Sequence, residues 1–294
     1  MKYVNSLKIG KQVIIENHPK FANSNFNADN SGWTNFAIKV DNRFIFRFPR
    51  NDEAYKAINK EYQILKILNE KLPSNIKGPK YIYSRLDTDY PYVGYELIEG
   101  EFLTNELYNR LSDEEKEKVL NGMSEFLNIL HSIDYKELNL EIKNPIQWYK
   151  EFYGRIQKIC FKYLDEDLKV KTIELFENYF NDETMTNYTP TLIHGDLSED
   201  HILVTSDGVG IIDFGDLMVF EPSYDLIWAY ILGKEFYNKL LEKYDGNKDE
   251  NFEHRIRDFH IKRPPYDGII YADEIGDKDL LKEELQTLKS NLLK

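Results

Sequence analysis

Two segments organise this chain: Leu192-Ile193-His194-Gly195-Asp196-Leu197-Ser198-Glu199-Asp200-His201-Ile202-Leu203-Val204 and, close behind it, Ile211-Ile212-Asp213-Phe214-Gly215-Asp216. Short apolar runs flank both segments, which predicts that each acid stands at the end of a short buried strand. Between them, Thr205-Ser206-Asp207-Gly208 has the composition of a tight turn. We therefore expect a hairpin that carries Asp196, His201 and Asp213 to one edge of a small sheet.

Two carboxylates and an imidazole at one edge suit a particular chemistry. One acid can orient or deprotonate an attacking hydroxyl, while the other acid and the imidazole hold a divalent metal on the phosphates of a nucleotide. A lone His-Gly-Asp or Asp-Phe-Gly arises often by chance. Both in this order, each beside apolar strands, favour a kinase-like catalytic hairpin.

The composition limits the class of protein. The chain has 294 residues, of which 41% are hydrophobic and 14% aromatic, enough for one large domain or two modest lobes. Its single cysteine, Cys160, allows no intrachain disulfide or cysteine-cluster zinc site and suits the cytoplasm. We find neither a signal peptide nor an apolar run of the roughly 18 residues that span a membrane. The net charge of −13 disfavours a nucleic-acid partner.

Residues 1 to about 50 are predicted to form strands, the first at the apolar run 13–15. The stretch 30–40 reads as a small-residue loop and a strand, and the alternating stretch 43–48 as a second strand. A loop of this kind can cover nucleotide phosphates, with Gly32 allowing close approach and Ser31 and Thr34 adding hydroxyl donors. Alternation puts Arg47 on the face opposite the phenylalanines, where it can grip phosphate.

A helix is predicted over residues 52–71, because apolar side chains recur there at spacings of three and four. Glu61 lies beside this apolar stripe and can pair with Arg47. The strand from Tyr92 runs into Gly100, a natural linker between two lobes. There the backbone groups of Glu96 and Ile98 can hydrogen-bond a purine.

The rest of the chain reads as mostly helical. Ser112 and Glu115 form a capping box that opens a helix with an apolar face. Residues 146–180 are predicted to be helical with a heavy aromatic load, and residues 280–293 to be a closing amphipathic helix. The partly acidic stretch 266–274 contains Tyr271, which we expect near a substrate.

With these parts assembled, the chain resembles the aminoglycoside phosphotransferase family of antibiotic kinases, most closely its 2″ branch. The motif His194-Gly195-Asp196 followed by His201 and the motif 212–216 carry the resemblance. It implies an α+β, bilobal protein-kinase-like fold with a small N-terminal antiparallel-sheet lobe, residues 1–98, and a larger, mostly helical C-terminal lobe, residues 99–294. It also implies a cytoplasmic, monomeric kinase.

The same resemblance implies the roles of the site residues. Asp196 matches the catalytic base, Asp213 the chief ligand of Mg²⁺ and His201 the second ligand. The donor is ATP or GTP. Its binding is assigned to Ser31, Gly32, Thr34, Arg47, Glu61, Glu96 and Ile98. Substrate contacts are assigned to Asp196, Glu199, Asp200, Asp216 and Tyr271.

Some residues point to other acceptors. The run Arg47-Phe48-Pro49-Arg50 resembles macrolide kinases, and the stretch 231–235 has a single acid where the 2″ enzymes have a cluster. The alternatives are therefore a macrolide 2′-phosphotransferase or a housekeeping choline or sugar kinase. A non-catalytic pseudokinase is disfavoured, because Asp196 and Asp213 are both present.

Overall fold

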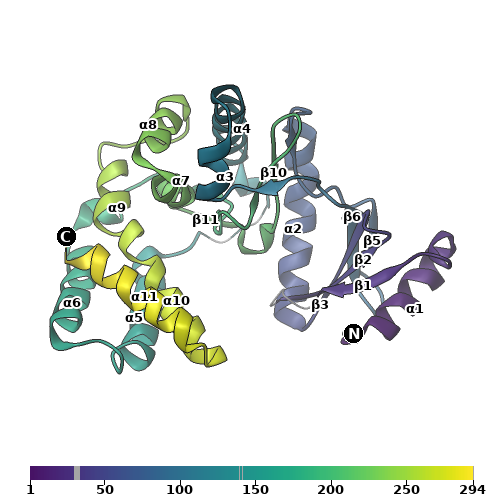
Figure 1. Cartoon of the computed structure of the whole chain (residues 1–294), viewed down its shortest axis with the longest axis horizontal. Coiled ribbons are helices and arrows are strands. Elements are labelled where there is room, and N and C mark those ends of the chain that lie inside the picture. Colours follow the sequence, from purple (N-terminus) through teal and green to yellow (C-terminus); the bar gives the residue numbers. More distant parts are fainter. Residues whose placement is uncertain (30–33, 139, 141, 294) are drawn as a thin grey trace. The chain divides into compact units, whose positions relative to one another are not determined.

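The computed structural model describes residues 1–29, 34–138, 140 and 142–293 (Figure 1). Its α-helices are α1 Leu7–Asn17, α2 Asp52–Lys71, α3 Asn105–Arg110, α4 Asp113–His131, α5 Pro145–Ile159, α6 Glu166–Asn181, α7 Ile227–Leu232, α8 Lys234–Lys243, α9 Phe252–Asp258, α10 Pro264–Ile275 and α11 Lys278–Leu292. Its 3₁₀-helices are η1 Pro19–Phe21, η2 Tyr135–Leu138, η3 Glu183–Met185, η4 Phe214–Asp216, η5 Pro222–Leu226 and η6 His260–Lys262. Its strands are β1 Phe26–Asp29, β2 Asn35–Val40, β3 Phe44–Pro49, β4 Ile76–Lys77, β5 Tyr83–Arg85, β6 Tyr92–Glu96, β7 Glu101–Phe102, β8 Thr191–Ile193, β9 Ile202–Val204, β10 Val209–Ile211 and β11 Met218–Phe220. No helix in these described ranges has the length and apolarity to cross a membrane.

The chain divides into two compact units that interleave in sequence. The first unit comprises residues 1–130 and 194–217, and the second comprises residues 131–193 and 218–294. The division predicted from the sequence, between residues 98 and 99, falls inside the first unit. The division by contacts groups residues 194–217 with residues 1–130. The boundary between the two lobes therefore stays a prediction.

The first unit contains a five-stranded antiparallel sheet in the order β1-β2-β3-β6-β5. The turn between β2 and β3 is made by Asp41 and Asn42, both at φ 52°, a left-handed conformation that these short polar side chains tolerate. Phe44, Phe46 and Phe48 point into a core with residues of α1 on one face of this sheet. The alternation predicted for this strand is confirmed.

The prediction that the first 50 residues form only strands is wrong, because residues 7–17 form α1. Gly10, Val13 and Ile14 are its buried residues, at the spacing of one helix face, and they pack against the sheet. A side chain at Gly10 would overlap Ile38 of β2. Contact with the sheet, which short-range patterns do not reveal, thus outweighs the strand propensity of the run 13–15.

Helix α2 spans residues 52–71, as predicted, and begins where Asn51 caps Ala54 at 2.9 Å. Its buried face contains Ile58, Ile64, Leu65 and Leu68 together with the charged Glu61. A buried glutamate in an apolar stripe requires a partner. The helix therefore sets the position of an ionic contact as well as a core face.

The second unit is mainly helical. Tyr149 of α5, Phe176 and Tyr179 of α6 and Ile269 of α10 share one apolar core. Helix α11 packs against α10, as Figure 1 shows. The helix predicted over residues 146–180 is interrupted: α5 ends at Ile159, and Asp165 starts α6 by accepting a hydrogen bond from the Leu168 amide at 2.9 Å. A cap of this kind favours a new helix over continuation.

Candidate phosphotransfer site

The predicted catalytic hairpin is present in the first unit. Strands β9 and β10 pair antiparallel with Ile202 opposite Ile211, within a four-stranded sheet of order β4-β10-β9-β7. The Thr205 amide donates to the Gly208 carbonyl at 3.0 Å and closes the turn. His201 enters β9 and Asp213 leaves β10, so both lie at the same end of the hairpin.

His201 contacts both acids. Its Nδ1 lies 2.6 Å from the Asp196 carbonyl oxygen and 3.4 Å from Asp196 Oδ2. A carbonyl only accepts, so this contact puts the proton on Nδ1. In the neutral imidazole, the Nε2 lone pair then lies 3.8 Å from Asp213 Oδ2. A lone pair facing a carboxylate suits a shared cation between them.

Asp213 has an unusual backbone. It adopts φ 60° and ψ 66°, a left-handed conformation that carries a steric cost for a residue with a side chain. Its side chain is 50% exposed, and Oδ1 lies 3.5 Å from Arg47 Nη2. The conformation turns the carboxylate toward Arg47 and His201 at the end of β10.

His194 contacts both of the segments that carry the acids Asp196 and Asp213. It is fully buried, with Nε2 3.1 Å from the Ile212 carbonyl oxygen and Nδ1 accepting the Asp196 amide at 3.3 Å. Its ring packs on Phe214 with a centroid separation of 4.6 Å. No separate role was predicted for His194, although its position directly after an apolar strand was a signal for one.

Arg47 is held in a buried cluster on α2 and β3. Its Nη1 donates to Glu61 Oε1 at 2.7 Å and lies 3.2 Å from the Tyr81 hydroxyl, which itself donates to Glu61 Oε1 at 2.6 Å. Burial acts to lower the pKa of Arg47, but Glu61, Tyr81, Tyr95 and Asp213 together outweigh it, and the pKa lies well above its usual value. The pair of Arg47 and Glu61 that the sequence suggested is present. Tyr81 was missed.

Tyr81 and Tyr95 shield this cluster. Their rings meet edge to face at 5.8 Å. Burial, and then the charge of Glu61, raises the pKa of Tyr81 well above its usual value, so its hydroxyl stays protonated and donates to Glu61. Burial likewise raises the pKa of Tyr95 to about 12. Tyr95 lies near the end of β6, whereas Tyr81 precedes β5, so the two come together only in the folded chain.

A sequence model of the phosphotransferase enzyme family matches residues 25–258 of this chain. The chain belongs to that family. The family assignment expected from the sequence is confirmed.

The chain is also similar to solved structures of phosphotransferases and to one further protein sequence. An APH(2″) enzyme in complex with GDP and kanamycin has a TM-score of 0.84 at 25% identity, covering 97% of this chain and 98% of that one. A macrolide 2′-phosphotransferase type I has a TM-score of 0.67 at 18% identity, covering 98% and 99%. The Bacillus subtilis (strain 168) "Uncharacterized protein YcbJ" is 23% identical over 215 residues, 69% of this chain and 67% of its own. The α+β, protein-kinase-like fold class is confirmed.

The other predicted nucleotide-binding residues are on the first unit or outside the described part. Ser31 and Gly32 lie outside the described residues, and Thr34 is exposed just before β2. The Leu97 amide donates to the Arg43 carbonyl at 2.7 Å. Because the backbone groups of successive residues in a strand point in opposite directions, the N–H and C=O of Glu96 face away from β3. The pairing of β5 with β6 extends from Tyr92 only to Gly94, short of Glu96.

The predicted substrate residues are on both units. Glu199 and Asp200 are exposed in the turn before His201. Asp216 also reaches solvent, but surrounding protein atoms, and then the charge of Asp213, raise its pKa. Tyr271 is 37% exposed on α10 of the second unit. The structure thus brings Asp216 close to the metal-binding candidates and leaves Tyr271 on a separate unit.

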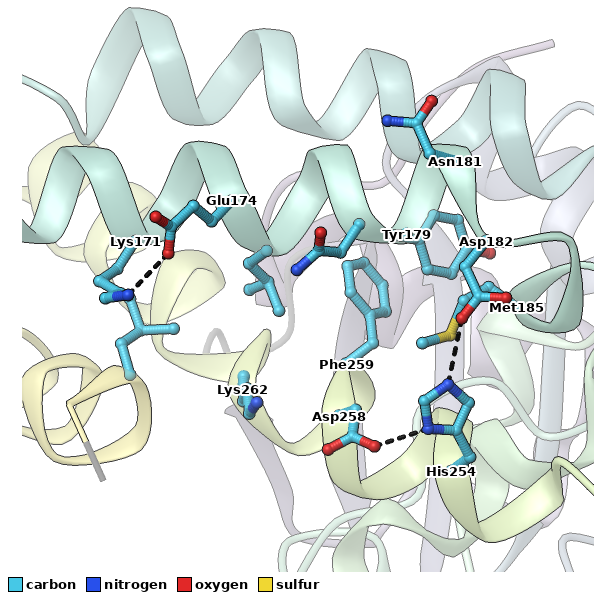
Figure 2. A pocket seen from close by; sticks show the side chains of 13 residues that line it. Lys171, Glu174, Tyr179, Asn181, Asp182, Met185, His254, Asp258, Phe259 and Lys262 are labelled. Carbon is cyan, nitrogen blue, oxygen red and sulfur yellow. Dashed lines mark hydrogen bonds and ion pairs between the residues drawn. The ribbon is translucent and has the colours of Figure 1, made fainter.

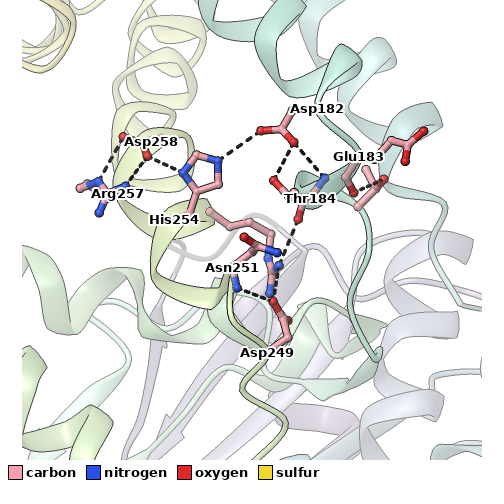
Figure 3. Close-up of polar contacts among 10 residues, drawn as sticks. Asp182, Glu183, Thr184, Asp249, Asn251, His254, Arg257 and Asp258 are labelled. Atoms are coloured by element: carbon pink, nitrogen blue, oxygen red, sulfur yellow. Dashed lines mark hydrogen bonds and ion pairs between the residues drawn. The ribbon is translucent and has the colours of Figure 1, made fainter.

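The second unit of this phosphotransferase contains a cavity of about 600 Å³ beside α6 and α9. Tyr179 and Phe259 pack at a centroid separation of 4.1 Å and line it, and His254 stands at its edge (Figure 2). His254 Nε2 lies 3.2 Å from Asp182, and Nδ1 lies 2.6 Å from Asp258 (Figure 3). These polar groups engage one another and tie the end of α6 to α9, a structural role.

Proposed function

We propose that this phosphotransferase transfers the γ-phosphate of ATP or GTP to a hydroxyl of an antibiotic, an aminoglycoside of the 2″ type, and so gives resistance. The observation that carries the proposal is the convergence of Asp196, His201 and Asp213 at one end of the hairpin, with Arg47 3.5 Å from Asp213. The likeness to an APH(2″) enzyme solved with GDP and kanamycin supports it.

Nucleotide binding is assigned to the first unit. Arg47 offers a permanent positive charge to the phosphates, held by Glu61 and Tyr81. The loop of Ser31, Gly32 and Thr34 is assigned to cover them. The outward-facing backbone at Glu96, followed by Ile98, is assigned to the purine, since main-chain groups at a strand end can bond its edge.

The residues present fit a magnesium ion shared with the nucleotide. Within the described ranges, no group of three or more His, Cys, Asp or Glu side chains could hold a metal by itself. Mg²⁺ is commonly held by one or two carboxylates together with substrate phosphates, which matches Asp213 with His201 beside it. When bound, the ion neutralises charge on the transferred phosphoryl group.

Asp196 is proposed to receive or orient the acceptor hydroxyl proton. Its carboxylate is 52% exposed and therefore reachable by a substrate, and His201 fixes the backbone at the same residue. Glu199, Asp200 and Asp216 add negative charge near it, suited to the amino groups of an aminoglycoside. Tyr271 is proposed as a further substrate contact.

A macrolide acceptor is the second candidate. Glu235, the one acid in the stretch 231–235, pairs with Lys239 at 2.8 Å, which offsets its charge toward a cationic substrate. The arginine at position 47 also favours this candidate. A choline or sugar kinase uses the same chemistry on a smaller acceptor.

A coupled phosphate-transfer assay tests the proposal with kanamycin, gentamicin, erythromycin and choline, each with ATP and with GTP. Turnover on an aminoglycoside supports the 2″ assignment. Turnover on erythromycin alone favours the macrolide candidate, and turnover on choline alone favours a housekeeping kinase. Absence of turnover with all acceptors, despite nucleotide binding, would contradict the antibiotic substrate.

A further inference from the structure

Lys60 of α2 reaches the loop that follows Asp213. Its Nζ donates to the Leu217 carbonyl oxygen at 2.5 Å, and its side chain is half-buried. Lys60 immediately precedes Glu61, so adjacent residues of one helix make the two contacts: Glu61 with Arg47 and Lys60 with the loop. No motif in the sequence distinguished Lys60 from the other lysines of α2.

The loop needs such an anchor. Asp213 is in a left-handed conformation, and the short helix η4 ends at Asp216. The cap residue Leu217 makes only a long 3.4 Å contact from its amide to the Phe214 carbonyl. The last carbonyls of a helix have no partner within it. An ammonium on the Leu217 carbonyl therefore satisfies a helix end and holds the loop from the side of α2.

The charges around the loop favour the same arrangement. Surrounding protein atoms raise the pKa of Asp216, and repulsion from Asp213 adds to this effect. Lys60 and His201 act in the opposite direction on that carboxylate. Replacing Lys60 by a neutral side chain removes a cation that acts on the Asp216 carboxylate of the loop.

Arg47 and Lys60 together connect three elements. Arg47 of β3 contacts Glu61 on α2 at 2.7 Å and Asp213 in the loop at 3.5 Å, and Lys60 contacts the loop again at Leu217. We propose that Lys60 is a positioning residue that fixes the Asp213–Leu217 loop on α2, so that the place of α2 and the presentation of the Asp213 carboxylate to magnesium are coupled. This inference rests on the proposed function.

Three variants test the role of Lys60. K60M removes the donor but keeps the aliphatic stem, K60R keeps a cation, and K66M alters an exposed lysine on the same helix. For K60M, we expect the magnesium concentration for half-maximal nucleotide binding to rise about tenfold, as for other partners that orient a metal ligand. Nucleotide binding without magnesium should stay unchanged. K60R should recover most of the loss, and K66M should match the wild type.

Hydrogen–deuterium exchange on the nucleotide-free protein gives a second readout. In K60M, amides of residues 213–220 should exchange faster, while those of the hairpin turn 205–208 should not. Equal exchange and equal magnesium dependence in K60M and wild type would overturn the proposal, as would a folded K60R that behaves like K60M. If the wild type binds no nucleotide, the proposed function fails, yet the exchange rates still decide whether Lys60 holds the loop.

Discussion

The Asp196 carboxylate combines exposure to solvent with a fixed backbone. The side chain is 52% exposed, its carbonyl accepts from His201 Nδ1, and its amide donates to His194. We expect D196N to lower turnover about 100- to 10,000-fold, the usual contribution of a positioned acid or base. Nucleotide affinity, measured by titration calorimetry, should be largely retained, because the asparagine keeps the backbone contacts.

Asp207 provides a matched control for this substitution. It is an acid in the turn of the same hairpin, where its carboxylate accepts a hydrogen bond from Lys77 at 2.8 Å in an exposed ion pair. D207N should keep near-normal turnover. Near-normal turnover in D196N as well would contradict the role proposed for Asp196.

Asp213 presents its carboxylate at the end of β10 beside His201 and Arg47. We expect D213A to remove the part of nucleotide binding that depends on magnesium, since a chief ligand of the ion is lost. Titration calorimetry with and without magnesium separates this part from binding by the remaining residues. Identical magnesium dependence in D213A and the wild type would show that the metal is held elsewhere.

At the scale of an element, the hairpin turn depends on a close approach at Gly208. A Cβ added there would lie 2.1 Å from the Asn75 carbonyl oxygen, which also accepts from the Val209 amide at 3.0 Å. Because that backbone is fixed by β4, G208A should destabilise the protein by about 1–3 kcal/mol, as overpacking does. Chemical denaturation measures the change.

Gly154, inside α5, is the matched control because no atom lies within 4 Å of an added Cβ. G154A should leave stability unchanged or raise it by up to about 1 kcal/mol through helix propensity. Turnover should fall only in G208A, because the hairpin carries His201 and Asp213. If G208A were as stable as G154A, the turn would accommodate a Cβ at residue 208 without a loss of stability, which would contradict the prediction.

At the scale of the whole molecule, a buried ionic network supports the fold of the second unit. Glu221 is fully buried and bonds His260 Nε2 at 2.7 Å through one oxygen and Arg255 and Ser223 through the other. Arg255 is also buried and reaches Asp249. E221Q leaves Arg255 with less compensation, and we expect a loss of about 3–5 kcal/mol at neutral pH.

This loss depends on pH. Burial would raise the pKa of Glu221, but the charge and hydrogen bond of His260, with the charge of Arg255, bring it below its ordinary value. Ionised Glu221 therefore stabilises the fold above the ordinary glutamate pKa of about 4.3, and the contribution is lost as pH falls through the lower folded value. The stability difference between wild type and E221Q should shrink below about pH 4.

Glu166 serves as the surface control. It is 85% exposed and pairs with Lys169 one turn along α6. E166Q should unfold like the wild type at every pH. A gap between E221Q and the wild type that stayed constant under acid would show that packing, and not ionisation, carries the effect of Glu221.

Local patterns were enough where neighbours in sequence are also partners in space. The hairpin turn at Gly208, the whole of α2 and the capping box are of this kind, and Ser112 and Glu115 do exchange hydrogen bonds at 2.7 and 3.3 Å. The family motifs also identified the fold class and the phosphotransferase chemistry. The strand predicted at residues 13–15 was wrong, because the sheet beneath Gly10 selects a helix there.

The sequence by itself determined helix α2, the hairpin with its two acidic motifs and the placement of His201 and Asp213 at one end of that hairpin, since turn chemistry and apolar periodicity act over a few residues. Only the tertiary structure decided the partners of the buried charges. Tyr81 joins the Glu61–Arg47 pair that the sequence suggested, Lys60 reaches Leu217, and Glu221 meets Arg255 across long sequence separations. The physical reason is that a charge removed from water needs a partner, and packing chooses which one.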